Sequence, residues 1–431
     1  MSRPQSLVMT ARTIAVFAGL GLGVIAGCNK KAENKEAAGS AAPAAGAAAG
    51  DKSASATPGV TATEIKIGQS IPYSGPASAY AMLGKGEGAY FKMINDKGGI
   101  NGRKINFVSL DDGYSPPKAV ENVRKLVENE GVALIFNNVG TAHNAAVQKY
   151  LNDRKVPHLF IASGADRWAD PEHFPWTMGF QPSYRGEAHV YARYLMKEKP
   201  NAKLCVLYQN DDFGKEYLAG LKEVFGAQAD KILINTASYE VTDPTADSQV
   251  VTLQAAGCDT LLTAATPKFA AQTIRKVADL GWKPLHFMSN VSVSRTAVLG
   301  PAGLDKSTGL VTAGYLKDIN DPKLADDPGL NEFRAFAKQY LEGLDATDIT
   351  LVYAFAAAQT MVQVLKQCGA DLSRENIMKQ AASLHKVQLG VAGNGALIDT
   401  GATDFRPFQQ VQLGRFNGNN FDEFGDVLTT D

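Results

Sequence analysis

Short runs of β-branched residues alternate with helical patterns along most of the chain. The first four runs are bounded by turn-forming residues and are expected to be strands: Ile65–Ile71, Ile105–Asp111, Val132–Asn138 and Val156–Ile161. Between them, Lys118–Asn129 carries an apolar stripe at helical spacing, and the prolines before it suit a helix start. This alternation predicts a parallel sheet with helices on both faces.

A second series of alternating elements begins near Tyr184. Its expected helices are Tyr184–Lys199, Gly214–Phe225, Ala246–Ala256 and Lys268–Leu280. Its expected strands are Leu204–Tyr208, Ile232–Ala237, Thr260–Thr263 and His286–Met288. Two successive series predict two doubly wound α/β lobes.

The last part of the chain breaks this rhythm. Its expected elements are the helices Leu330–Leu341, Thr350–Lys366 and Arg374–Ser383, followed by a hairpin of Pro407–Phe416 and Phe421–Val427. The helices could form a third domain, or the chain could return to the first lobe and then to the second. The pattern alone leaves both arrangements open.

The N-terminus has the features of an export signal. The apolar run Thr13–Ile25 follows two arginines and is too short to span a bilayer permanently. It leads into Ile25-Ala26-Gly27-Cys28, which resembles a bacterial lipobox, in which the cysteine thiol accepts a lipid. An ordinary signal peptide with an unrelated cysteine is the alternative. We expect a signal peptide over residues 1–27 and lipidation of Cys28.

The next segment, residues 28–60, contains almost no large apolar side chains. Ala, Gly, Ser and Lys dominate it, so it cannot bury enough surface to offset its chain entropy. We expect a disordered tether that anchors the protein to the membrane through the lipid, in the periplasm or at the cell surface. The remaining chain is long enough for two domains with sizeable cores.

Composition and motifs argue against several classes of function. The net charge is −1 and no basic cluster occurs, which excludes nucleic acid as an expected partner. The six histidines are scattered, with no helical pair and no nearby cysteine, so we expect no metal site. No nucleophile elbow, zinc-protease motif or phosphate-binding loop is present, and we expect neither an enzyme nor a cofactor.

Two acidic pairs follow expected strands without indicating catalysis. Adjacent residues on an extended chain point to opposite faces, so Asp111 and Asp112 are better explained as turn or helix-start caps. Asp211 and Asp212 receive the same interpretation. The glycine-rich run Gly84–Gly88 lies too far from its strand for a dinucleotide fingerprint, and close helix packing is the better explanation.

Three cysteines remain besides the lipobox cysteine. An odd number in an exported protein predicts at least one free thiol, which we expect to be buried. Cys205 and Cys258 lie at or near the starts of two expected strands, so a disulfide between them is possible but not required. Cys368 is the third.

The loops after strands hold the candidate site, because open α/β sheets bind ligands at the carboxyl ends of their strands. Gly140 lets the backbone approach a ligand, and Thr141 offers a hydroxyl beside the free N–H groups of a helix start. This arrangement favours an anion such as a carboxylate. A simple N-cap is the alternative role for Thr141, and the two roles are compatible. The loop Ser163-Gly164-Ala165 is of the same kind.

Several motifs resemble the leucine/isoleucine/valine-binding proteins of branched-chain amino-acid ABC transporters, which have the type I periplasmic binding fold. They are Ile71-Pro72-Tyr73-Ser74-Gly75-Pro76, the stretch INDKGGING at 94–102 and the Asp111-Asp112 turn. The similarity continues through Asp212-Phe213-Gly214 and Phe287-Met288 to the terminal hairpin.

The resemblance implies two Rossmann-like lobes joined by a three-stranded hinge, with the ligand between them. The expected N-terminal lobe is 61–182 plus 316–400, and the expected C-terminal lobe is 183–315 plus 401–431. The lobes would close on a small molecule by hinge motion. The protein would act as a monomer and deliver its ligand to a membrane-embedded ABC permease. A ligand-sensing component with a separate signalling partner is the alternative.

The resemblance also implies which residues contact the ligand. In such proteins the ligand's carboxylate meets N–H and hydroxyl groups of the first lobe. The matching first-lobe positions are Tyr80, Gly140, Thr141, Ser163, Gly164 and Ala165, and the second-lobe positions are Phe213, Thr266 and Val291. Tyr80 and Phe213 are lone loop aromatics, which could equally be core residues.

Two departures from the family pattern bear on the ligand. The family's amino-acid binders carry an acid after the Phe-Met strand, which pairs with the ligand's ammonium, but Ser289-Asn290-Val291 occupies this stretch. Burying an ammonium without a charged partner costs several kcal/mol. The family's tyrosine near Thr266 is also absent from the neighbouring sequence. We therefore expect a small carboxylate or amide with an apolar or aromatic body, with amino acids as the alternative.

Overall fold

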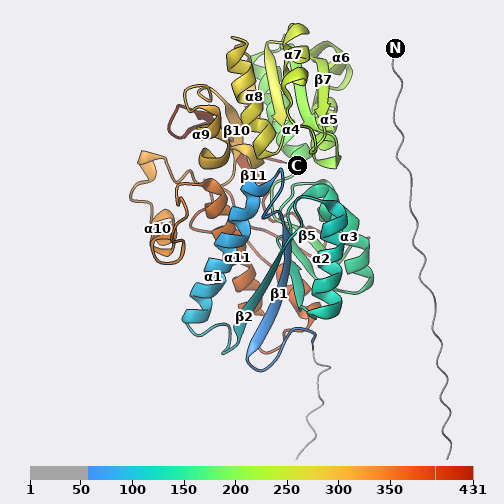
Figure 1. The fold of residues 1–431 in the computed structure, drawn as a ribbon, viewed down its shortest axis with the longest axis vertical. Helices are drawn as coiled ribbons and strands as arrows, with labels where there is room; N and C mark the ends of the chain where they lie inside the picture. Colours follow the sequence, from blue (N-terminus) through green and yellow to red (C-terminus); the bar gives the residue numbers. More distant parts are fainter. Residues whose placement is uncertain (1–56, 394, 431) are drawn as a thin grey trace, which may run out of the picture. The chain divides into compact units, whose positions relative to one another are not determined.

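The computed structural model describes residues 57–393 and 395–430 (Figure 1). The predicted signal peptide, the lipidation of Cys28 and most of the tether lie outside these residues.

Five parallel strands form the first sheet, in the order β2-β1-β3-β4-β5. They are β1 (Glu64–Ile71), β2 (Lys104–Asp111), β3 (Leu134–Phe136), β4 (His158–Ile161) and β5 (Thr177–Gly179). Every residue of β3, β4 and β5 is buried. Such strands read as continuous apolar runs when helices cover both faces of the sheet. The four predicted strands are confirmed, whereas β5 was not predicted because its short segment ends in a glycine and lacks a run of β-branched residues.

Helices from both ends of the described chain cover this sheet. They are α1 (Ala81–Asp96), α2 (Pro116–Arg124), α3 (Thr141–Asp153), α10 (Pro328–Tyr340), α11 (Ile349–Gln367) and α12 (Arg374–Ala381). A π-helical turn at Lys125–Asn129 continues α2. The return of α11 to the first lobe is visible in Figure 1, where α11 lies behind α1. The rings of Tyr90 and Phe355 join the two helices, with centroids 5.1 Å apart.

Glycines in α1 allow this close approach. A Cβ placed on Gly86 would lie 2.7 Å from the Cβ of Ala354, a separation that requires one of the helices to shift. The packing interpretation of this glycine-rich run is therefore confirmed. The helix α11 is long and apolar enough to resemble a membrane span, but 72 % of that window is buried inside the protein. It is the core helix of the first lobe.

The second sheet has seven strands, in the order β12-β11-β10-β9-β8-β6-β7. They are β6 (Leu204–Gln209), β7 (Leu233–Tyr239), β8 (Thr260–Ala264), β9 (Leu285–Met288), β10 (Val311–Gly314), β11 (Gln410–Phe416) and β12 (Phe421–Thr429). The first five are parallel, and the hairpin β11–β12 joins antiparallel to β10. The terminal hairpin therefore belongs to the second sheet, as the resemblance implies.

The helices of this second lobe are α4 (Tyr184–Glu198), α5 (Asp212–Phe225), α6 (Ala229–Ile232), α7 (Asp247–Ala255), α8 (Pro267–Asp279) and α9 (Gly300–Ala302). Three crossings join the two sheets: from β5 to α4, after β10, and between α12 and β11. The exact lobe boundaries, 61–182 with 316–400 and 183–315 with 401–431, stay a prediction.

The cysteines of the second lobe form a disulfide. Cys205 in β6 is bonded to Cys258, which lies just before the neighbouring strand β8. Disulfides of this kind persist in oxidising compartments outside the cytosol. Cys368 is free and buried, as the odd cysteine count predicted, and burial raises the pKa of its thiol to about 12.

The acidic pairs have structural roles. Asp111 accepts from the backbone N–H of Gly113, and Asp112 accepts from that of Tyr114, so both stabilise the turn after β2. Neither caps a helix, because the N-cap of α2 is Ser115. Asp211 caps α5 by accepting from the N–H of Gly214.

Candidate functional site

A small cavity of about 30 Å³ lies where the two lobes meet. Of the nine predicted ligand contacts, six line it: Tyr80, Gly140, Thr141, Phe213, Thr266 and Val291. The first three come from the first lobe and the last three from the second. The other three predicted residues, Ser163-Gly164-Ala165, line a separate small cavity beside Arg406.

Ser163 nevertheless acts on the first cavity through Thr141. Its Oγ lies 2.7 Å from Thr141 Oγ1 and accepts from Trp168 Nε1 at 3.0 Å and from the N–H of Ala165 at 3.3 Å. An indole N–H and a backbone N–H can only donate. These two N–H donors occupy acceptor positions of the Ser163 hydroxyl, which favours Ser163 as the donor to Thr141 or to Tyr184. With Ser163 as the donor, the Thr141 proton is available to a ligand in the cavity.

The start of α3 adds further donors at this point. Gly140 is the N-cap residue, and no side chain accepts from the first-turn N–H groups. Its φ of +98° lies in the region that favours glycine, and a Cβ there would lie 2.4 Å from His143 Nδ1. The uncapped helix start and the Thr141 hydroxyl together favour an acceptor group, best of all a carboxylate.

The second lobe presents a fully engaged hydroxyl. Thr266 is the N-cap of α8, and its N–H donates to the hydroxyl of Tyr239 at 2.9 Å. The two hydroxyls lie 3.2 Å apart, and that of Tyr239 donates to Gln209 at 3.2 Å. The sequence around Thr266 lacks a tyrosine, yet Tyr239 contacts Thr266 in the folded protein. It comes from the end of β7, 27 residues earlier, where no local pattern points to Thr266.

Both predicted aromatics line the small cavity; Phe213 is buried and Tyr80 is half-buried. Phe213 is 3 % exposed and packs edge-on against Tyr184, with ring centroids 4.8 Å apart. Tyr80 donates to the backbone carbonyl of Val291 at 3.1 Å, a bond that joins the two lobes. Core packing and cavity lining are therefore not exclusive for either residue.

A second bond between the lobes involves Asp348. One of its carboxylate oxygens caps α11 by accepting from Thr350, and the other accepts from Ser294 and Thr296 of the second lobe. The carboxylate is 2 % exposed, which strengthens these bonds relative to surface ones. The two lobes are hydrogen-bonded to one another in this conformation.

Sequence reasoning missed several residues that line the cavity. Tyr114 has a φ of +58°, and its ring packs at a tilt against that of His143, with centroids 4.3 Å apart. Burial raises the pKa of Tyr114. Gln181 follows β5 at the first crossing. It lines both small cavities and also a larger one, which is described below. The turn conformation that aims Tyr114 inward leaves no periodic signal in the sequence.

A buried carboxylate is hydrogen-bonded to Ser289-Asn290-Val291, the stretch that lacks an acid. Glu187 in α4 is completely buried and accepts from Asn290 N at 3.0 Å and from Asn290 Nδ2 at 2.6 Å. It also accepts from the hydroxyls of Tyr191 and Tyr217. Burial raises its pKa to about 7, against the opposing effect of these bonds. No local pattern in the sequence indicates this pair, because 103 residues separate Glu187 from Asn290.

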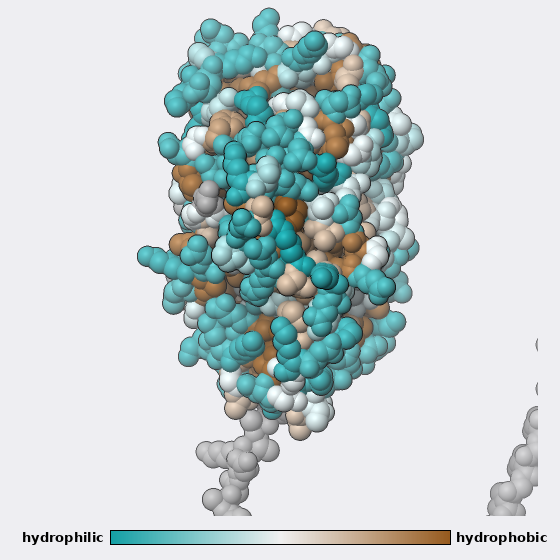
Figure 2. All heavy atoms as spheres, turned by 90° about the vertical axis from the view of Figure 1, so that its left-hand side faces the viewer, coloured by the Kyte–Doolittle hydropathy of each residue, from teal (hydrophilic) through white to brown (hydrophobic). Residues whose placement is uncertain are grey.

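A larger cavity of about 120 Å³ adjoins the small one. The two share Tyr80, Leu83, Gln181 and Val291 in their linings. Figure 2 shows the side of the protein that carries α1 and α10, where hydrophobic surface lies among hydrophilic side chains about halfway up. Among the described residues, no group of three or more His, Cys, Asp or Glu side chains is arranged to hold a metal ion.

Comparisons with known proteins agree on one family. A sequence model of periplasmic binding proteins matches residues 64–420. Leu/Ile/Val-binding protein homolog 7 of Brucella abortus (strain 2308) is 26 % identical over 362 residues, which cover 77 % of this chain and 84 % of the relative.

Solved structures show the same fold. A branched-chain amino acid ABC transporter structure from Thermus thermophilus with bound valine has a TM-score of 0.77 at 16 % identity, over 85 % of this chain and 97 % of that one. A fatty acid ABC transporter substrate-binding protein from Thermomonospora curvata has a TM-score of 0.71 at 23 % identity, over 86 % and 94 %. At these identities the likeness shows the fold alone.

The family match covers most of the chain, and the two-lobed α/β architecture is the type I periplasmic binding fold. Proteins of this family bind small molecules in the periplasm and deliver them to ABC permeases; they are not enzymes. The chain belongs to the periplasmic binding protein family.

Proposed function

We propose that the protein is a lipoprotein, anchored through Cys28, that captures a small carboxylate or amide between its lobes and delivers it to an ABC importer. The ligand carries an apolar or aromatic body. The observation that carries this proposal is the Thr141 hydroxyl, which lines the cavity beside the uncapped start of α3 and can donate to a ligand when Ser163 donates to it. A carboxylate supplies the two acceptor oxygens that such a site needs.

The named relatives support a range of carboxylates. The similar structure from Thermus thermophilus has valine bound, and the one from Thermomonospora curvata belongs to a fatty acid ABC transporter. Valine and fatty acids are both carboxylates with apolar bodies, and they share little else. The chain's own residues fit this common part, because the donors gather at Gly140 and Thr141 while Leu83 and Phe213 line the same cavity.

The experiment is a thermal-unfolding screen of the chain from Asn29 onward, which lacks the lipidated cysteine. Carboxylates are compared with their methyl esters, which keep the apolar body but lose the negative charge. A carboxylate at about 100 times its dissociation constant adds about 2.7 kcal/mol, a rise of a few degrees in the unfolding midpoint. Equal shifts for acids and esters, or no shift with any carboxylate, would contradict the proposal.

Membrane anchoring is tested separately in cells. The wild-type chain is expected in the membrane fraction, and the Cys28→Ser variant is expected to leave it. An unchanged membrane fraction for the variant would contradict lipidation at this residue.

A further inference from the structure

The larger cavity has far more room than a small ligand head needs. A site needs roughly 10–15 Å³ to admit one water-sized group, so volumes of about 30 and 120 Å³ admit about two or three groups and about ten groups, respectively. A carboxylate matches the small cavity. The side chain of a branched-chain amino acid is too small to fill the larger one.

The two cavities adjoin at shared lining residues. Tyr80, Leu83, Gln181 and Val291 line both, and Tyr80 donates to the carbonyl of Val291. A molecule that extends from Thr141 into the larger space has to pass these residues. Much of the lining beyond them is apolar. It includes Val293, Leu299, Ile349, Phe416 and Phe421. This lining suits an apolar or aromatic body.

One fixed acceptor faces the larger cavity. Asn290 lines it, and its backbone N–H and one Nδ2–H donate to Glu187, which fixes the amide and leaves Oδ1 without a donor among the described residues. The orientation survives protonation of Glu187. The hydroxyl of Tyr217 has Ser289 as an alternative partner and that of Tyr191 has the carbonyl of Met288. Asn290 therefore keeps its bonds in both states and presents an acceptor.

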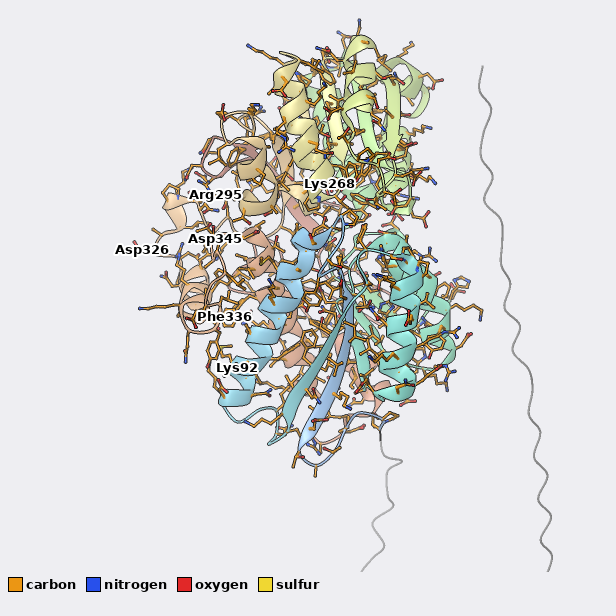
Figure 3. All side chains as sticks on the ribbon, in the orientation of Figure 1. Lys92, Lys268, Arg295, Asp326, Phe336 and Asp345 are labelled. Carbon is orange, nitrogen blue, oxygen red and sulfur yellow. A yellow bond between two sulfur atoms is a disulfide. The ribbon has the colours of Figure 1, made fainter. Side chains whose placement is uncertain are left out.

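The charged groups at or near this cavity already have hydrogen-bond partners within the protein. Figure 3 shows Arg295 and Asp345 on the same side of the protein, one from each lobe. Arg295 donates to the carbonyl of Asn419, and hydrogen bonds from Thr347, with a smaller effect of Arg295, lower the pKa of Asp345. Asp318 accepts from the N–H of Phe421 at 2.9 Å. Because each of these groups has a partner within the protein, the body of the ligand needs no charge to bind here.

We propose that the larger cavity holds the body of the ligand, so that the ligand is an elongated carboxylate with an apolar or aromatic body and an N–H group that donates to Asn290. This inference rests on the proposed function, in which Thr141 holds the carboxylate. It names a class of N-acylated or similarly extended amino carboxylates rather than free branched-chain amino acids.

The probes are three carboxylates measured by isothermal titration on the chain from Asn29 onward. N-benzoylglycine has the carboxylate, the N–H and an aromatic body; O-benzoylglycolate has an ester oxygen in place of the N–H; valine has no extended body. We expect N-benzoylglycine to bind about tenfold more tightly than either of the others. Tighter binding of valine, or no binding of N-benzoylglycine, would overturn the inference.

A cavity-filling variant tests the location. A Cβ on Gly314 would meet only the carbonyl of Gln412, at 3.8 Å, so Gly314→Leu places a side chain in the larger cavity without a backbone clash. It should weaken N-benzoylglycine by about tenfold and leave valine within about twofold. Thr350→Phe fills the same cavity from the first lobe and serves if Gly314→Leu fails to fold. Gly401→Leu is the control, because nothing lies within 4 Å of a Cβ there.

Two further variants separate the possible failures. Thr141→Val should weaken the binding of N-benzoylglycine and of valine. If it weakens the binding of neither, the proposed carboxylate site is wrong. If it weakens both while the filled cavity leaves N-benzoylglycine unchanged, only the inference about the larger cavity is wrong. Asn290→Leu should abolish the preference for N-benzoylglycine over O-benzoylglycolate. A preference that persists would overturn the role of Asn290.

Discussion

At the edge of the first lobe, the Thr141 hydroxyl can donate to a ligand when Ser163 donates to it. At the edge of the second lobe, the hydroxyl and the N–H of Thr266 are both hydrogen-bonded to Tyr239. The second lobe's Asn290 is likewise held by Glu187. The first lobe thus has hydrogen-bonding capacity left for the head of a ligand. The second lobe forms a wall whose polar groups are already arranged, so lobe closure on a ligand needs little rearrangement there.

The largest expected effect comes from comparing the buried acids of the two lobes. Glu187 and Glu87 are both fully buried, but Glu87 accepts only from Gln69, and its Oε1 has no partner. Burial raises the pKa of Glu87 well above its usual value. Glu187→Leu would leave the two donors of Asn290 unpaired and should cost about 4 kcal/mol of unfolding free energy.

Glu87→Leu is the matched variant and should cost about 1 kcal/mol or less, because Gln69 also donates to the carbonyl of Asn137. Urea unfolding of the two variants measures the difference. Equal costs would contradict the view that the second lobe depends on a saturated polar network.

A pH dependence of stability should accompany this network. Burial raises the pKa of Glu187 to about 7, that of Glu216 to about 8, and those of Asp112 and Asp211 to about 6. Between about pH 4 and pH 8 these acids therefore keep protons that the unfolded chain releases. The buried His143, His158 and His286 act in the opposite sense below about pH 6.5, because burial lowers their pKa values to about 4, 3 and 3. The acids act up to a higher pH, so stability should fall overall from pH 5 to pH 8.

The measurement is the urea midpoint at pH 5 and at pH 8, with the lower midpoint expected at pH 8. Glu187→Gln removes one of the titrating groups, so its midpoint should change less between the two pH values. A wild-type midpoint that rises with pH would contradict the assignment.

The start of α3 gives the smallest expected difference in unfolding free energy between a variant and its control. Gly140→Ala combines a positive φ with a Cβ position 2.4 Å from His143 Nδ1, and should cost about 2 kcal/mol. Gly102→Ala is the control, because its φ is +81° and nothing lies within 4 Å of a Cβ. It should cost about 1 kcal/mol. Urea unfolding compares the two, and a larger cost at Gly102 would show that His143 does not constrain the site.

Local patterns were sufficient for most of the fold. Buried strands such as Leu204–Gln209 are runs of apolar and β-branched residues, and the repeated alternation predicts two lobes. The strands β5 and β10 were not predicted, because each is short and ends in a glycine, unlike the equally short β3, β4 and β9. The return of α11 to the first lobe needed the family resemblance, since a helical period does not say which sheet the helix covers.

The candidate site was predictable only where it depends on loops after strands. Gly140 and Thr141 lie in such a loop and do line the cavity. The position of Ser163 behind Thr141, and that of Glu187 behind Asn290, depend on contacts between distant segments. Side chains of this kind are chosen by the folded environment, and no spacing in the sequence records the choice.

One pair of variants tests the difference between the lobes most directly. Thr141→Val and Thr266→Val each replace a hydroxyl in the same cavity by a methyl group, and isothermal titration with N-benzoylglycine measures both. Thr141→Val should weaken binding by roughly tenfold, because its proton is the one available to the carboxylate. Thr266→Val should change binding by about twofold or less, since its hydroxyl already faces Tyr239. A larger loss for Thr266→Val than for Thr141→Val would contradict the account that the first lobe binds the head of the ligand.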